Sequence, residues 1–142
     1  MILWVSFVVL FSVAVWCLEL VEGYKITTSE YYGLRNIGFM FIMIMTFMAS
    51  VFYPVILLPI SIVISRFVSG VSIRVLLYSI LGGIGGTLIF HKFYSHYFIQ
   101  EYNLNSTNSI IIFGLVGFIY ALIDNDLKRR TYKHPTQKGN PI

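Results

Sequence analysis

Residues 36–65 read NIGFMFIMIMTFMASVFYPVILLPISIVIS, a run of 30 residues without a charged side chain. As a straight helix the run would be about 45 Å long, whereas the hydrocarbon core of a bilayer is about 30 Å thick. Two crossings would need about 40 residues and a turn, so we predict one span. Pro54 and Pro59 each remove a backbone donor and crowd the preceding turn, which favours a kink. We expect a Pro-kinked span over residues 37–64, and an ordinary kinked helix is favoured over a broken helix that lines a site.

Three other stretches also lack charge over nearly the length of a membrane crossing. The four predicted spans cover residues 2–21, 37–64, 71–90 and 107–124. The sequence therefore predicts an all-α, polytopic integral membrane protein with four transmembrane helices in a domain over residues 1–130. Residues 131–142 are rich in Pro, Gly and polar side chains, and we expect them to form a disordered cytoplasmic tail.

The composition of the 142 residues points to the same class. Hydrophobic residues make up 57% and charged residues 11%, whereas soluble domains carry about 25% charged residues. This excludes a soluble domain and a disordered chain. Cys17 is the only cysteine, so a disulfide scaffold is excluded as well.

The first predicted span has two interpretations. Val21 and Gly23 are small enough to flank a signal-peptide cleavage before Tyr24. However, residues 2–18 have no basic leading segment, and the apolar run is longer than that of a typical signal peptide. A retained membrane anchor is therefore favoured.

The distribution of Lys and Arg predicts the orientation. With four spans, the side that holds both chain ends carries seven of these residues and the opposite side three. Because basic loops stay inside the cell, we expect a multi-pass protein of the cell membrane with both ends in the cytoplasm. Five basic residues close to the spans are expected to meet anionic lipid headgroups: Arg66, Arg74, Lys128, Arg129 and Arg130. The alternative is that they only set the topology. The net charge is +4, but the basic residues do not form a stripe, so no nucleic-acid partner is expected.

Small residues recur four apart in the third predicted span. Such residues lie on one helical face and allow two backbones to approach closely. We expect this face to pack against small residues of the fourth span, with packing against a second copy of the protein as the alternative. The predicted packing residues are Ser79, Gly82, Gly83, Gly86, Gly114 and Gly117.

No ionisable residue lies deep inside a predicted span. Glu19, Arg74, His91 and Asp124 stand at span edges, where they can reach water or snorkel. This argues against a proton-coupled carrier, a carboxylate metal site and an intramembrane protease, which need such groups in the interior. His91 and His96 lie about 140° apart on a helix, so interfacial anchoring is favoured over a metal or catalytic site. We predict no catalytic residue, metal or cofactor.

Two stretches carry a family resemblance. YPVILLPISIVISR (residues 53–66) and IDNDLKRR (residues 123–130) resemble small, uncharacterised multi-spanning membrane proteins of Bacillus-type bacteria. The resemblance implies a plasma-membrane protein of about this size. It implies no activity and no site residue.

These observations favour a non-enzymatic protein that acts through helix–helix contacts, such as an accessory subunit, a regulator or an immunity-type protein. Its expected partners are membrane lipid and either a second copy or another membrane protein. One alternative is a small oligomeric channel or carrier. A further alternative is an enzyme that acts on lipid headgroups at His91 and His96.

Overall fold

The structure is a computed structural model that describes residues 1–68 and 70–133, with side chains described as far as residue 130. Over these residues the chain is helical and contains no β-strand. The longer helices are α1 (Ile2–Val21), α3 (Phe39–Phe52), α4 (Leu58–Phe67), α5 (Val71–Phe93) and α7 (Ser106–Lys133). The short elements are η1 (Gly23–Lys25), α2 (Leu34–Ile37), the π-helical turn η2 (Tyr53–Leu57) and α6 (His96–Glu101).

Four helical stretches of the described chain are long and apolar enough to cross a membrane. They are Ile2–Lys25, Phe39–Phe67, Val71–Phe93 and Ser106–Arg130. The predicted all-α fold with four membrane-length helices is therefore confirmed. The last helix is longer than predicted and continues to Lys133, which takes in the first three residues of the predicted tail. The other residues of that tail, 134–142, lie outside the described chain.

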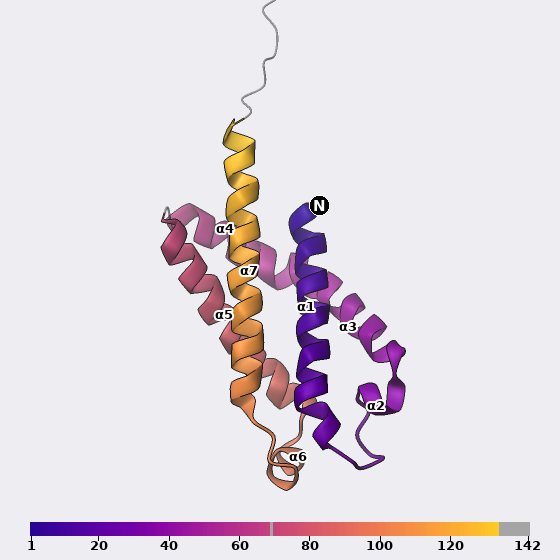
Figure 1. Ribbon diagram of the computed structural model, residues 1–142. Helices are drawn as coiled ribbons and strands as arrows, with labels where there is room; N and C mark the ends of the chain where they lie inside the picture. Colours follow the sequence, from indigo (N-terminus) through magenta and orange to yellow (C-terminus); the bar gives the residue numbers. More distant parts are fainter. Residues whose placement is uncertain (69, 134–142) are drawn as a thin grey trace, which may run out of the picture.

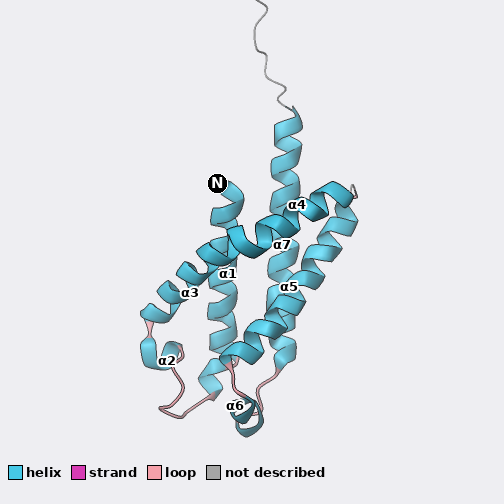
Figure 2. Ribbon diagram, turned by 180° about the vertical axis from the view of Figure 1, so that it is seen from behind, coloured by secondary structure: helices cyan, strands magenta, loops and turns pink. Residues whose placement is uncertain are grey.

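The second membrane-length helix changes its winding at the first of its two prolines. Between α3 and α4, Leu58 N–H donates to the carbonyl of Tyr53, five residues back, in a π-helical turn. Pro54 stands at the start of this turn and Pro59 one residue after Leu58. A proline ring removes a backbone N–H and crowds the preceding turn of a helix. A π turn is wider than an α turn, so it accommodates the two prolines. The helix continues through this point, and Figure 2 shows it running obliquely across α1 and α7.

The helices place the two described chain ends together. The N-terminus, the turn between α4 and α5, and the end of α7 lie at one end of the molecule, which we call the terminal end (Figure 1). The segments around α2 and α6 lie at the opposite end, which we call the loop end. This is the arrangement expected of four helices that alternate in direction.

Helices α5 and α7 pack through their small residues. A Cβ atom added to Gly82 would collide with the Phe113 carbonyl, and one on Gly86 would come within 2.7 Å of the Ser109 carbonyl. A Cβ on Gly117 would collide with the Tyr78 carbonyl of α5. The backbones of the two helices therefore approach as closely as glycine allows.

The other predicted packing residues lie at the same interface but are less crowded. A Cβ on Gly83 would lie 3.3 Å from the Ile110 side chain, and one on Gly114 would lie 3.6 Å from the Ser79 carbonyl. Gly85, one residue before Gly86, has open space at its Cβ position and faces away from α7. All six predicted packing residues thus lie between α5 and α7 of one chain.

Helix α1 is joined to α3 by polar contacts within an apolar interface. Trp4 Nε1 donates to the Ser50 carbonyl over 3.3 Å, and the hydroxyls of Ser12 and Thr46 are 3.0 Å apart. Because lipid offers no competing hydrogen bonds, such contacts help to fix how two membrane helices pack.

Candidate functional site

Glu19 is buried at the end of α1, with only 1% of its surface exposed. The hydroxyl of Tyr31 donates to its carboxylate over 2.6 Å, and that of Tyr94 over 3.2 Å. The backbone N–H of Leu34, the first residue of α2, donates over 2.8 Å. One carboxylate thus joins α1, the loop before α2 and the residue that follows α5.

Two glycines make room for this carboxylate. A Cβ atom on either Gly23 or Gly33 would overlap the carboxylate oxygens of Glu19. Of the ion pairs in the described chain, none involves Glu19. Its carboxylate is therefore held by neutral hydrogen-bond donors.

Glu22 is the second buried carboxylate and is fully covered. Lys25 forms an ion pair with it at 2.8 Å, and Asn105 N–H donates over 3.0 Å. The side-chain amide of Asn108 also donates to it. Since Asn105 directly precedes α7, the acid lies near the positive N-terminal end of that helix. We call these residues the loop-end carboxylate cluster: Glu19, Glu22, Lys25, Tyr31, Tyr94, Asn105 and Asn108.

The two phenols of this cluster are held in their neutral form. Burial raises the pKa of Tyr31 well above its ordinary range, and the neighbouring Tyr94 and Glu19 raise it further. Burial also raises the pKa of Tyr94, and the charge of Glu19 adds to the shift. Both hydroxyls therefore remain donors to the carboxylate at physiological pH.

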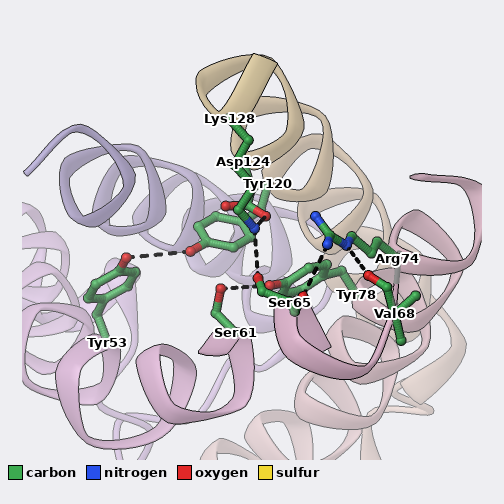
Figure 3. A network of polar contacts seen from close by, with 9 residues as sticks. All are labelled: Tyr53, Ser61, Ser65, Val68, Arg74, Tyr78, Tyr120, Asp124 and Lys128. Carbon is green, nitrogen blue, oxygen red and sulfur yellow. Dashed lines mark hydrogen bonds and ion pairs between the residues drawn. The ribbon is translucent and has the colours of Figure 1, made fainter. Parts of the chain in front are cut away.

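A third buried acid, Asp124, lies at the terminal end and is 2% exposed. Lys128 binds it at 2.6 Å and also donates to the Ser65 hydroxyl over 2.7 Å (Figure 3). The pair thus connects α7 to α4. It does so at the place where α4 turns into α5.

Arg74 supports the same turn from α5. Its Nε donates to the Val68 carbonyl over 2.6 Å and an Nη to the Ser65 carbonyl over 3.2 Å, which satisfies carbonyls at the end of α4. The hydroxyl of Tyr78 donates to Ser61 over 2.7 Å. Figure 3 shows these side chains and the Tyr53–Tyr120 contact. We call this group the terminal-end network: Tyr53, Ser61, Ser65, Val68, Arg74, Tyr78, Tyr120, Asp124 and Lys128.

Of the residues placed at span edges, Glu19 and Asp124 do not reach water, because both are buried. Counting residues along the chain placed them correctly at the ends of apolar stretches. It could not show that the Tyr31 loop or Lys128 covers them. Two features of the sequence could have indicated a buried acid at this place. Glu19 and Glu22 lie three residues apart, and a loop rich in Tyr and Gly follows them.

The five predicted headgroup residues divide into two groups. Arg74 and Lys128 bond within the chain. Arg66 and Arg129 are exposed, and the exposed Arg130 forms an ion pair with Asp126 at 2.8 Å.

The two histidines lie exposed near the loop end. His91 Nδ1 is 2.9 Å from the Thr87 carbonyl, and His96 Nε2 is 3.2 Å from the Gln100 amide. Within residues 1–68 and 70–133, no group of three or more His, Cys, Asp or Glu side chains lies close enough to hold a metal ion.

The buried polar atoms of the described side chains all have hydrogen-bond partners. Fold and polar clusters together define a class: an all-helical protein with four membrane-length helices, whose buried acids accept hydrogen bonds from within the chain. The chain matches no protein-family model, and comparisons with curated proteins and with solved structures also found no match.

Proposed function

We propose that the chain is a multi-pass protein of the cell membrane that acts without catalysis, through helix–helix contacts. The role fits an accessory subunit, a regulator or an immunity-type protein. Its partners in this proposal are membrane lipid and another membrane protein or a second copy.

The observation that carries the proposal is that the buried acids are engaged in hydrogen bonds within the chain. Glu19 and Glu22 accept hydrogen bonds from other elements of the same chain. Asp124 accepts one from Lys128 of its own helix, and Lys128 also donates to Ser65 of α4. A catalytic acid needs access to a substrate. These groups instead hold the ends of helices together, which supports a structural role for them.

The surface with the fewest contacts inside the chain indicates where a partner helix would pack. The stretch Phe39–Phe67 is the longest and least buried of the four membrane-length helices. On α3 the side chains of Phe39 and Phe47 are 71% and 72% exposed. In a bilayer this face meets either lipid or another helix, and a partner helix would be held there by van der Waals packing.

The positions of basic residues support cytoplasmic chain ends. Arg66, Arg74 and Arg129 all belong to the terminal end, together with the N-terminus. Lys25, Arg35 and Lys92 belong to the opposite side of the predicted topology. Basic residues concentrate on the cytoplasmic side of membrane proteins.

Site-specific photo-crosslinking in living cells tests the partner contact. A photoreactive phenylalanine analogue replaces Phe47 on α3, and the matched control carries it in place of Leu88, which is 67% exposed on α5. We expect a discrete protein adduct from position 47 and none from position 88. In mild detergent, Phe47→Ala should then recover less of the identified protein than Leu88→Ala.

Two results would contradict the proposal. The first is the absence of a protein adduct from position 47, or equal adducts from both positions. The second is ion or solute flux through liposomes that contain only the purified chain, which would establish the channel or carrier alternative.

A further inference from the structure

An apolar groove of about 360 Å³ lies between α4 and α5. Its lining includes Pro59, Ile60 and Val63 on α4, and Leu77, Ile80 and Leu81 on α5. Figure 2 shows that the two helices meet at the terminal end and diverge away from it. The groove therefore lies in the half of the molecule that holds Arg66 and Arg74.

Two arginines stand at the terminal end of this groove. Arg66 follows Val63 by three residues on α4, and Arg74 precedes Leu77 by three residues on α5. Each is therefore about one helical turn, roughly 5 Å, from a lining residue. Arg74 also reaches across to the carbonyl of Ser65, so its guanidinium spans the space between the helices.

The charge at this end is not balanced within the described chain. Lys128 neutralises Asp124, and Arg130 neutralises Asp126. None of the ion pairs among residues 1–68 and 70–130 involves Arg66 or Arg74. The two bonds of Arg74 use two of its five N–H donors.

We propose that this groove binds one anionic phospholipid, with an acyl chain along the apolar lining and the phosphate at Arg66 and Arg74. A guanidinium presents its N–H groups in a planar fork that matches a phosphate. The apolar lining holds the acyl chain by van der Waals contacts. This proposal rests on the proposed function, in which the chain is embedded in the membrane and its terminal end faces the cytoplasm. Anionic lipids lie in the cytoplasmic leaflet, and basic pockets between helices bind their headgroups.

A zwitterionic lipid would fill the same groove with the same acyl chains, but its headgroup carries a compensating positive charge. Inorganic phosphate would satisfy the arginines without using the groove. The proposal therefore predicts a preference for lipid charge and a need for the acyl chain, and the two can be tested separately.

Native mass spectrometry of the full chain in mild detergent tests the charge preference. Phosphatidylglycerol and phosphatidylcholine with identical acyl chains are added in equal amounts. We expect at least fivefold more retained phosphatidylglycerol, and Arg66→Gln should reduce that preference on the order of fivefold. Lys92→Gln, which removes an exposed basic residue at the far end of α5, should leave it unchanged. Equal retention of the two lipids, or an equal effect of the two substitutions, would overturn the proposal.

A second pair of variants tests the groove. Ile80→Trp adds bulk to the lining, whereas Ile84→Trp adds the same bulk one turn away at a position that does not line the groove. We expect the first to lower phosphatidylglycerol retention several-fold and the second to preserve it. If inorganic phosphate displaces the lipid at equal concentration, or both tryptophans act alike, the acyl groove is wrong. Because these measurements are made in detergent, they stand or fall separately from the orientation and the partner contact.

Discussion

Glu19 shows how a membrane-length helix can end in a buried charge. Its carboxylate accepts bonds from two tyrosine hydroxyls and one backbone N–H, while Gly23 and Gly33 leave it space. Removing such an acceptor leaves several buried donors without a partner, which costs more than the bonds themselves contribute. Substitution of Glu19 is therefore expected to lower the stability of the chain more than substitution of most other residues.

We predict that Glu19→Ala lowers the free energy of unfolding by about 2–4 kcal/mol, since the donors of Tyr31, Tyr94 and Leu34 lose their acceptor. Glu19→Gln retains one oxygen acceptor and should cost less. Thermal unfolding of the purified chain in detergent measures both. Glu30→Ala, an exposed acid in the same loop, is the control and should change little. A Glu19→Ala protein as stable as Glu30→Ala would show that the cluster does not hold the loop.

The raised pKa of Tyr31 predicts a pH dependence. The phenol keeps its proton in the folded chain, whereas in the unfolded chain it ionises with a pKa near 10.0. The unfolded state alone loses protons as pH rises above about 10, so the stability that Tyr31 contributes is present below that pH and is lost above it.

Accordingly, Tyr31→Phe should be less stable than the parent chain near pH 7, because it lacks the bond to Glu19. The difference should shrink as pH rises above about 10. Unfolding in detergent across this range measures it, with Tyr32→Phe, at an exposed phenol, as the control. A difference that stays constant with pH would contradict the account.

At the scale of elements, the α5–α7 pair depends on where each glycine faces. Gly82 and Gly85 lie three residues apart on α5. A Cβ atom would meet the Phe113 backbone at Gly82 and open space at Gly85. Backbone cannot move aside as a flexible side chain can, so the pair separates when Gly82 gains a methyl group.

We predict that Gly82→Ala destabilises the chain by about 1–3 kcal/mol. Gly85→Ala should be neutral or stabilising by up to about 1 kcal/mol, since alanine favours the helix. The two variants add the same atom three residues apart, so their difference in unfolding temperature reports the interface alone. Equal effects would mean that α5 does not approach α7 through this face.

At the scale of the whole molecule, the composition and the spacing of charged residues were sufficient to predict the four membrane-length helices. The uncharged stretches predicted four membrane-length helices, and the predicted packing residues of the third span face the fourth in the structure. The buried acids could not be predicted in this way. Whether Glu22 is covered depends on Asn105 and Asn108, more than 80 residues further along the chain, and sequence spacing does not report such contacts.

The same limit applies to the basic residues. Arg74 and Lys128 resemble Arg66 and Arg129 in sequence, because all four flank apolar stretches. The fold separates them, since Arg74 and Lys128 bond to the end of α4. Only the three-dimensional arrangement shows which of these cations also bond to protein atoms, as Arg74 does with part of its guanidinium.

We propose above all that four helices cross the cell membrane and leave both chain ends in the cytoplasm. Single-cysteine labelling tests it in the full chain, after Cys17→Ser removes the only native thiol. His96→Cys lies on α6 at the loop end, and Arg129→Cys on α7 at the terminal end, both at exposed positions. We predict that a membrane-impermeant maleimide labels His96→Cys in intact cells and labels Arg129→Cys only after permeabilisation. Equal labelling of both cysteines in intact cells would contradict the four crossings, and the reverse pattern would contradict the orientation.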